Sequence, residues 1–367
     1  MNDKAKKSTA HKKTLRRGFT TGACATAATK SALNALLFGD FLNPVQITLP
    51  KGQKPSFPLQ SKKTGTGWAK AAIIKDAGDD PDVTHGATII VKISHGEKDK
   101  GVVFCAGKGV GIITKAGLAL GIGEPAINPA PRQMMTKIVN ELSKQANIAP
   151  DFSIKISVLN GKKIAKKTWN PRLGIIGGIS ILGTSGIVIP YSCSAWINSI
   201  HSGIDIAIAN GQNHIIGSTG DKSEQAVKKY LGLDDLAYID MGDFVGGLLK
   251  YANKKPLKKI TISGGFAKIT KLSQGASDLH SARSKVDFLM LANELKKLGA
   301  GQDIIEQTKT ANTANEVLEI ATKNKLPLAD IIAIQAKQKS KKILKNDDIQ
   351  FDIIIINRSG NIIAGTD

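Results

Sequence analysis

Strand and helix candidates alternate along the second half of this chain, and the alternation leaves few folds open. Two helix-forming segments, residues 222–231 and 243–253, each separate one apolar run of strand length from the next. Strands joined through helices run parallel, so the pattern predicts a doubly wound, Rossmann-like parallel sheet. The strand candidates are residues 205–209, 214–218, 238–241, 259–263 and 352–357.

In the first half of the chain, strand and helix candidates do not alternate. Thr20 and Thr21 precede a run of Ala and Leu that predicts a capped helix ending near Phe38. A second helix is expected to begin at Pro131, where apolar residues recur at helical spacing. Strands set apart from helices indicate a strand-rich α+β arrangement. The strand candidates are residues 45–49, 68–74, 87–93 and 102–104.

A hairpin is also expected in this half. Asn160-Gly161, a favoured turn dipeptide, joins two strand candidates at residues 152–159 and 162–168. The hairpin suits either half, so the boundary between the halves is expected between residues 145 and 170.

The length of 367 residues exceeds the usual size of one hydrophobic core, which favours two domains. We expect an N-terminal α+β domain at residues 15–150 and a C-terminal α/β domain at residues 151–367. The Lys-rich residues 1–14 have no apolar run after them, so they predict a disordered basic tail and not a signal peptide.

The charge balance points to an anionic partner. Lys and Arg total 51 against 30 for Asp and Glu, a net charge of +21. Cys24, Cys105 and Cys193 form no CxxC pair and lack zinc-ligand spacing, which predicts reduced thiols, a cytoplasmic protein and no bound metal. Residues 173–204 are uncharged, but Gly174, Gly177, Gly178, Gly183, Gly186 and Pro190 interrupt them, so we expect buried turns and short strands and not a membrane span.

The acidic turn at residues 75–84 is the first candidate for chemistry. Lys75 is followed by four carboxylates in seven residues, among them Asp76, Asp79 and Asp80. Such a cluster suits a hard cation or a polar ligand, although the spacing is not that of a calcium loop. A solvated turn is the alternative. Asp79 and Asp80 are candidate catalytic residues.

Glycine-rich segments are the second kind of candidate. The run at 107–123 leads to Asn128 and Arg132, and its main-chain N–H groups suit an anion. The run at 170–186 contains Arg172, which suits a carboxylate. The alternative is a glycine-rich turn in a sheet for the first run and a tightly packed β-turn-β core for the second. Two later turns, 218–220 and 263–266, each join a strand to a helix, a geometry that favours anions but is also common in α/β loops that bind nothing.

A segment at residues 277–287 places His280 beside Asp278 and Arg283. A histidine in such company suits proton transfer, so His280 is a third candidate catalytic residue. A capping or hydrogen-bonding role within the fold is the alternative.

In this order along the chain, six segments resemble the cobalt-precorrin-5B C(1)-methyltransferase family. The resemblance implies methyl transfer from S-adenosylmethionine to C-1 of a cobalt-bearing tetrapyrrole, giving cobalt-precorrin-6A in the anaerobic cobalamin pathway. It implies no particular catalytic residue, and cobalt arrives as part of the substrate. The segments are residues 17–22, 75–84, 107–114, 123–129, 170–186 and 278–287.

The patterns and the resemblance together assign candidate ligand contacts. The donor S-adenosylmethionine is expected in the α/β half, against Gly174, Gly177, Gly178, Gly183, Thr184, Ser185, Gly186, Gly264 and Gly265. The tetrapyrrole is expected to contact Thr20, Thr21, Lys75, Asp76, Asn128, Arg132, Arg172 and Arg283.

Two other functions remain open from the residues alone. A nicotinamide-dependent reductase fits a Rossmann-like half, but no GxGxxG with a later acidic residue is clear. A nucleic-acid-binding protein fits the charge, but aromatic stacking platforms are missing beside the lysines. We expect a small-molecule partner, no nucleic acid and no membrane, and the oligomeric state stays open.

Overall fold

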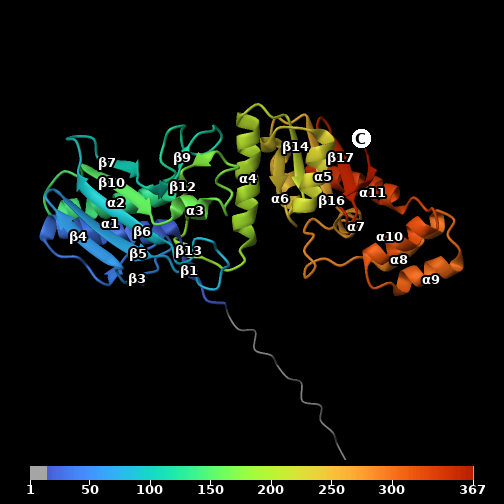
Figure 1. Ribbon diagram of the computed structural model, residues 1–367, viewed down its shortest axis with the longest axis horizontal. Helices are drawn as coiled ribbons and strands as arrows, with labels where there is room; N and C mark the ends of the chain where they lie inside the picture. The colour runs from blue at the N-terminus through green and yellow to red at the C-terminus, as the bar shows by residue number, and fades with distance from the viewer. Residues whose placement is uncertain (1–14, 367) are drawn as a thin grey trace, which may run out of the picture. The chain divides into compact units, whose positions relative to one another are not determined.

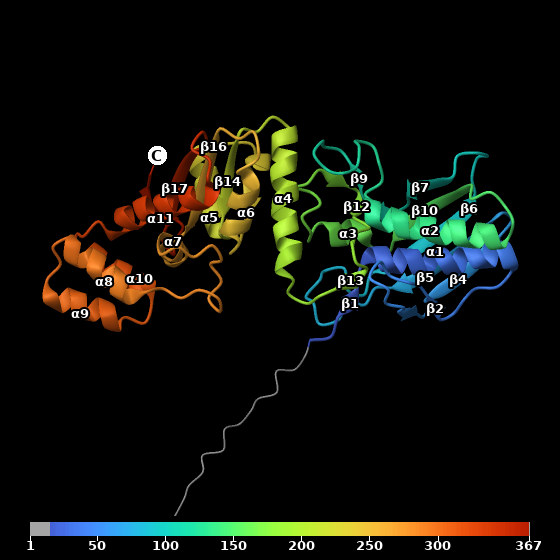
Figure 2. The ribbon, with the colours of Figure 1, turned by 180° about the vertical axis from the view of Figure 1, so that it is seen from behind.

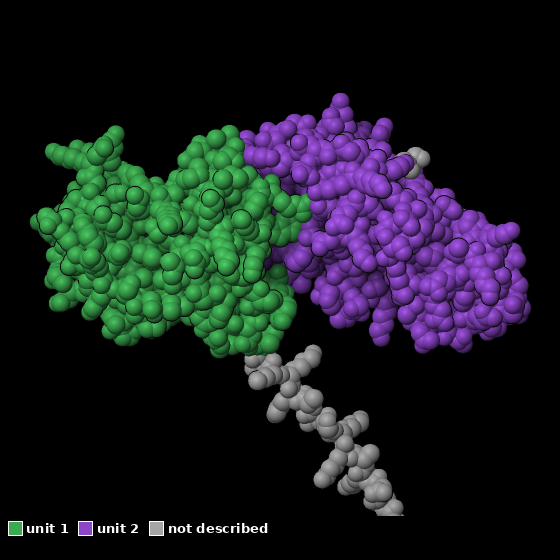
Figure 3. Space-filling view, in the orientation of Figure 1, with its two compact units in different colours: residues 1–114, 119–192 green, residues 115–118, 193–367 purple. Residues whose placement is uncertain are grey.

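The computed structural model describes residues 15–366, so the predicted basic tail at residues 1–14 lies outside the described residues. The chain forms two compact units, coloured separately in Figure 3. Unit 1 comprises Met1–Thr114 and Ala119–Ser192, and unit 2 comprises Lys115–Leu118 and Cys193–Asp367. The boundary expected between residues 145 and 170 therefore falls inside unit 1.

Unit 1 is built on a five-stranded sheet with the order β4-β5-β6-β10-β7. All neighbours are antiparallel except β10 and β7, which are parallel. The strands expected at 68–74, 87–93 and 102–104 are confirmed. The strands are β4 (Ser61–Gly65), β5 (Trp68–Ile74), β6 (Thr88–His95), β7 (Val102–Ala106) and β10 (Phe152–Val158).

Helices α1 (Thr21–Phe38) and α2 (Pro129–Gln145) pack together, and α1 lies on β5 and β6 (Figure 1). The predicted helix to Phe38 is confirmed, with Thr20 as its N-cap and Gly39 in the left-handed conformation at its end. Its small residues are fully buried, which lets the helix approach the sheet closely. The core of unit 1 lies between these helices and the sheet.

The predicted hairpin at 152–168 is wrong in its second strand. Residues 152–158 form β10, but Asn160 leads into the short helix α3 (Gly161–Ala165). Both edges of β10 are already paired, to β6 on one side and to β7 on the other. A hairpin partner for β10 has no free edge to occupy.

Short strand pairs attach residues 175–188 to the rest of unit 1. β11 (Ile175–Ile176) pairs with β9 (Ile112–Ile113), and β12 (Gly178–Ile179) pairs with β8 (Gly109–Val110). These pairs place the glycine-rich run in unit 1, although we expected it to open the α/β half. The remaining pairs are β1 (Gly18–Phe19) with β13 (Ile187–Val188), and β2 (Val45–Gln46) with β3 (Ser56–Phe57).

Unit 2 contains a second five-stranded sheet, with the order β15-β14-β16-β17-β18. The first four strands are parallel and β18 is antiparallel. The parallel strands expected at 214–218, 238–241, 259–263 and 352–357 are confirmed. The strands are β14 (His214–Ser218), β15 (Tyr238–Asp240), β16 (Lys259–Gly265), β17 (Gln350–Ile356) and β18 (Ile362–Gly365).

The two faces of this sheet are covered unequally. Helix α5 (Asp221–Leu231) packs against Ile216 and Ile354. The neighbouring strand residues Ile215 and Ile353 belong to the larger core with the other helices. These are α4 (Cys193–Ala209), α6 (Val245–Ala252), α7 (Phe266–Ser273), α8 (Phe288–Lys297), α9 (Gln302–Thr310), α10 (Ala314–Lys323) and α11 (Leu328–Leu344), seen from both sides in Figures 1 and 2.

The strand expected at 205–209 is wrong, because these residues are the last turn of α4. Ile200, Ile204 and Ala207 recur at helical spacing and are fully buried in the core of unit 2. The turns and short strands predicted within residues 173–204 accordingly give way to helix at Cys193. Across residues 15–366, no helix combines the length and apolarity that crossing a bilayer requires.

Candidate functional site

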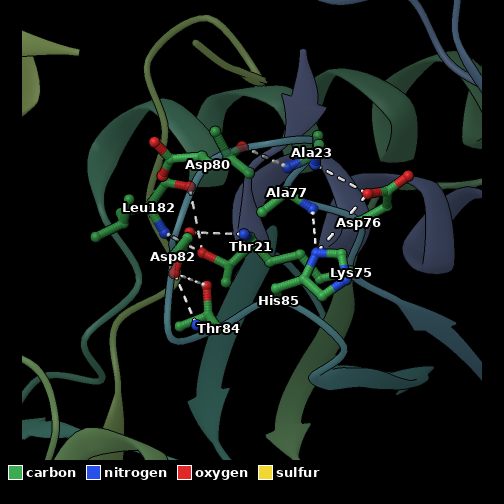
Figure 4. A network of polar contacts seen from close by, with 12 residues as sticks. Thr21, Ala23, Lys75, Asp76, Ala77, Asp80, Asp82, Thr84, His85 and Leu182 are labelled. Atoms are coloured by element: carbon green, nitrogen blue, oxygen red, sulfur yellow. Dashed lines mark hydrogen bonds and ion pairs between the residues drawn. The ribbon is translucent and has the colours of Figure 1, made fainter. Parts of the chain in front are cut away.

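The beginning of α1 lies against the glycine-rich turn around Leu182 (Figure 4). The Thr21 hydroxyl accepts a hydrogen bond from the Leu182 N–H at 2.9 Å. Gly22 N–H donates to the Leu182 carbonyl, also at 2.9 Å. Thr20 Oγ1 accepts from Ala23 N–H at 3.1 Å. The N–H groups of Gly22 and Ala23 in the first turn are therefore satisfied by protein groups, and both predicted threonines serve this contact.

Lys75 is a buried cation at the start of the acidic turn. Its side chain is 1% exposed, and its Nζ lies 2.7 Å from Asp82 Oδ2. Asp82 also accepts hydrogen bonds from the N–H and hydroxyl of Thr84. Burial disfavours the charge of Asp82, but the Lys75 ammonium and these hydrogen bonds outweigh burial and hold the pKa of the carboxyl below its usual range. Lys75 is thus fixed by Asp82, the last of the four carboxylates that follow it in the acidic turn.

Arg16 and Asp76 form the exposed ion pair of the same turn. Two guanidinium nitrogens of Arg16 lie 2.5 and 2.9 Å from the two carboxylate oxygens of Asp76. These hydrogen bonds, with one from Gly78 N–H, lower the pKa of Asp76 to about 2. Phe19 N–H donates to the Asp76 carbonyl at 2.7 Å, which joins the turn to β1.

His85 is a titratable residue of this cluster that sequence reasoning missed. Its Nδ1 accepts a hydrogen bond from Ala77 N–H at 3.1 Å and lies 3.8 Å from Asp76 Oδ1. An accepting Nδ1 leaves Nε2 to carry the proton of the neutral ring. The side chain is 54% exposed, so the ring reaches solvent. Its position one residue beyond the acidic turn was the available signal.

The remaining carboxylates of the turn bind main-chain groups. Asp79 Oδ2 accepts from Arg16 N–H at 2.7 Å, and Asp80 Oδ1 accepts from Tyr191 N–H at 2.8 Å. Each of the four predicted carboxylates thus has its own protein partner, and the turn ties three segments of unit 1 together. Within residues 15–366 no three potential metal ligands gather in one place.

Most glycines of the 174–186 run pack against the protein itself. A Cβ on Gly178 would lie 2.1 Å from the Gly109 carbonyl oxygen, and one on Gly183 would lie 2.3 Å from Thr20 Oγ1. Gly186 is similarly close to Leu49. The close backbone approach that we predicted for a methyl donor is therefore made by neighbouring segments of unit 1.

The other members of this run differ in exposure. Gly174 and Gly177 both have positive φ, but Gly174 is buried, whereas Gly177 is exposed and nothing lies within 4 Å of a Cβ built on it. The Thr184 side chain is exposed, while the Ser185 hydroxyl bonds the main chain of Ile187.

The predicted substrate residues Asn128, Arg132 and Arg172 are spread over unit 1. Asn128 occupies the N-cap position of α2 without a side-chain cap bond. Arg132 binds the carbonyls of Ile127 and Pro125, and it pairs with Glu124 at 2.7 Å. The Arg172 guanidinium lies over the Trp169 ring, 5.6 Å from its centroid. The structure does not join these three side chains into one cluster with Lys75.

His280 and Arg283 form a local turn in unit 2. Arg283 Nε binds Asp278 Oδ2 at 2.5 Å, and His280 N–H donates to Asp278 Oδ1. His280 Nδ1 accepts from Ala282 N–H at 3.2 Å. These contacts match the capping role that was the alternative for His280.

Gly264 and Gly265 end β16, and Gly265 lines a cavity of about 510 Å³ in unit 2. A Cβ on Gly264 would meet the Thr219 side chain at 2.9 Å, whereas Gly265 has nothing within 4 Å. The cavity is lined from the carboxyl ends of β14, β16 and β17. The sheet reverses its strand order between β14 and β16, so the cavity borders a topological switch point.

Ligand-binding α/β proteins hold small molecules at such a place, and this is the class that the fold and the cavity define. The chain belongs to the CbiD family. The family model CbiD matches residues 8–190, and the model CbiD, C-terminal domain, matches residues 278–367. The resemblance stated from the six sequence segments is thereby confirmed.

Curated relatives match nearly the whole chain under one name, "Cobalt-precorrin-5B C(1)-methyltransferase". The protein of Paramagnetospirillum magneticum is 53% identical, covering 97% of this chain and 99% of its own. The Brucella anthropi protein is 55% identical over 95% of each chain. A crystal structure of cobalamin biosynthesis protein (cbiD) from Archaeoglobus fulgidus is 28% identical and covers 73% of this chain and 83% of its own, with a TM-score of 0.39.

Proposed function

We propose that this protein is a methyltransferase that transfers a methyl group from S-adenosylmethionine to C-1 of cobalt-precorrin-5B, giving cobalt-precorrin-6A in cobalamin biosynthesis. The observation that carries the proposal is 53% identity to an enzyme of that name over 97% of this chain and 99% of the relative. The two family models match residues at both ends of the chain.

The chemistry asks for positioning more than for a covalent nucleophile. Methyl transfer to a ring carbon is a direct displacement at the methyl group, and holding the two reactants in line supplies much of the rate. The substrate carries acetate and propionate carboxylates, which suit a chain with a net charge of +21. Cobalt enters as part of this substrate.

The acidic turn of unit 1 is our proposed positioning element for the tetrapyrrole. Its buried anchor, Lys75 with Asp82, fixes the loop, and the exposed side of the loop presents Asp76 and His85. Thr20 and Thr21 hold the adjoining turn. One carboxylate oxygen of Asp79 and one of Asp80 accept hydrogen bonds from main-chain N–H groups. We therefore propose that these residues fix the loop geometry and do not transfer protons.

Gly264 and Gly265 remain our proposed contacts for the methyl donor, because they lie at the carboxyl end of a parallel strand beside the cavity. We also propose that unit 2 is a Rossmann-like domain and that the two units are independent domains. A cytoplasmic location is proposed from the three unpaired cysteines. The oligomeric state and a lack of nucleic-acid binding stay predictions.

The test is incubation of the purified protein with cobalt-precorrin-5B and methyl-labelled S-adenosylmethionine, followed by mass analysis of the tetrapyrrole. We expect one labelled methyl group on the ring. An unlabelled product after full incubation contradicts the proposal. Parallel titrations with NADPH and single-stranded DNA examine the two other functions, and tight binding of either would support that rival.

A further inference from the structure

The cavity of unit 2 is built from three strand ends, of which the proposed function uses only the two glycines that end β16. It measures about 510 Å³ and is lined at residues 219–223, 265–268 and 356–358, together with Asn315 of α10. The first three segments follow β14, β16 and β17, which are adjacent and parallel. Their carboxyl ends therefore meet at one edge of the sheet.

The lining is cationic. It contains Lys222, Lys268 and Arg358 against the single carboxylate Asp221. Lys268 is neutralised in place, since its Nζ lies 3.0 Å from Asp243 Oδ1. The other two cations have no carboxylate partner among the described residues.

Lys222 and Arg358 are held next to each other by the fold. Lys222 Nζ donates a hydrogen bond to the Arg358 carbonyl at 3.1 Å, although 136 residues separate them in sequence. The Arg358 guanidinium makes no ion pair or hydrogen bond within residues 15–366. Two uncompensated cations at one cavity wall favour an anionic occupant.

The backbone leaves room for that occupant. Gly220 has a φ of +154°, a conformation essentially restricted to glycine, and nothing lies within 4 Å of a Cβ built there. Gly265 is equally open. These glycines precede α5 and α7, and neither helix has a side-chain cap, so N–H groups at both starts are available to an anion.

We propose that this cavity is a carboxylate site, in which Arg358 and Lys222 bind a carboxylate of a reactant over Gly220 and Gly265. The choice of ligand rests on the proposed function, because both reactants carry this group. S-adenosylmethionine has one carboxylate at its amino-acid end, and the tetrapyrrole has several at its periphery. Arg358 supplies a planar fork that matches carboxylate geometry, and Lys222 supplies a point charge beside it.

Calorimetric titration of the full chain separates the two sources. The ligands are S-adenosylmethionine, its decarboxylated analogue and cobalt-precorrin-5B. The variants are Arg358→Gln and the double variant with Lys222→Gln. The matched control is Lys296→Gln, which removes one exposed positive charge from α8, outside the cavity. Circular dichroism and thermal melting verify that each variant is folded.

We expect Arg358→Gln to lower the affinity for one of the two reactants by roughly ten- to hundredfold. This is the effect of losing a charge-assisted hydrogen bond. If the donor is the ligand, the wild type prefers S-adenosylmethionine to its decarboxylated analogue, and the variant loses that preference. If the tetrapyrrole is the ligand, its affinity falls and that of the donor is unchanged. Both results support the proposal.

Affinities for both reactants that stay within twofold in the folded double variant would overturn the carboxylate site. A fall in affinity for both reactants that Lys296→Gln reproduces would also overturn the carboxylate site, because such a fall reflects only the net charge of the chain. Wild-type turnover is measured in the same series. A wild type that methylates cobalt-precorrin-5B while the double variant binds normally leaves the proposed function intact and removes only this inference.

Discussion

Lys75 and Arg16 show how differently two ion pairs of one turn depend on their surroundings. Lys75 is 1% exposed and Asp82 is 25% exposed, whereas the Arg16 and Asp76 side chains are 58% and 44% exposed. An exposed pair is screened by water and contributes little, but a buried charge that loses its partner is strongly destabilising. The two pairs therefore make a matched comparison.

We predict that Asp82→Asn lowers the free energy of unfolding by about 2 kcal/mol, because Lys75 keeps a buried charge without a counter-ion. The figure is below the range for fully buried pairs, since Asp82 is partly exposed. Asp76→Asn is expected to cost much less. Urea unfolding of both variants measures the difference, and equal losses would contradict it. Lys75→Met should cost less than Asp82→Asn, because it removes the buried charge itself.

The pH dependence of the Asp76 pair has a definite sign. Its pKa of about 2 in the folded chain lies below the value of about 3.9 for an unfolded Asp, so the pair stabilises the folded state above pH 4. That contribution is lost as pH falls from about 4 to 2. Thermal melts of wild type and Asp76→Asn should therefore differ at pH 5 and converge by pH 2. A difference in melting temperature that grows as the pH falls would contradict this prediction.

Arg172 stays our predicted substrate contact in unit 1. Its guanidinium lies over Trp169, an arrangement that orients a planar group and that Lys does not reproduce. Arg172→Lys should weaken corrinoid binding by roughly tenfold and leave S-adenosylmethionine binding nearly unchanged. A large fall in melting temperature with normal corrinoid affinity would make Arg172 a structural residue.

At the scale of elements, the start of α1 and the glycine-rich turn are one packed unit. Gly183 has a φ of +125°, and its Cα faces the Thr20 side chain that caps the helix. Gly177 also has a positive φ, of +90°, but open space surrounds it. The same substitution at these two positions separates backbone strain from collision.

We predict that Gly183→Ala destabilises the chain by more than Gly177→Ala. Both variants incur backbone strain of about 1–3 kcal/mol, and only the first drives a Cβ into Thr20 Oγ1. Thermal unfolding compares them directly, and equal melting temperatures would refute the contact. A Gly183 variant that loses binding of the methyl donor could do so because its fold is destabilised. Such a loss therefore does not test the methyl-donor site.

At the scale of the whole molecule, the net charge of +21 is a property that no single contact explains. Exposed lysines such as Lys296, Lys297 and Lys341 lie on helix surfaces, where each adds to the long-range field. Such a field raises the local concentration of a polycarboxylate substrate and is screened over about 10 Å at 0.1 M salt.

We predict that corrinoid affinity falls steadily as NaCl is raised from low to physiological concentration, while the affinity of S-adenosylmethionine, which carries few charges, changes less. Titrations at several salt concentrations measure both slopes. DNA should bind weakly at physiological salt. A corrinoid affinity independent of salt, or DNA binding stronger than corrinoid binding, would contradict a role for the charge in substrate capture.

Local sequence patterns were sufficient where one element's own residues decide its structure. Thr20 and the small residues after it predict α1, and the alternation after residue 210 predicts the parallel strands β14 to β17, because capping and side-chain periodicity act over a few residues. The six ordered segments also identified the family, since their residue types survive in sequence whatever their positions in space.

Tertiary structure alone decided which segments are neighbours. It gave both edges of β10 to other strands, it buried one face of residues 193–209 as helix α4, and it packed the Gly178 and Gly183 turns onto Gly109 and Thr20. Lys222 and Arg358, which are 136 residues apart in sequence, were likewise brought together only by the fold. Strand pairing, burial and charge compensation depend on contacts between residues distant in sequence. A local sequence pattern therefore does not predict which segment packs against a glycine or which carboxylate pairs with a lysine.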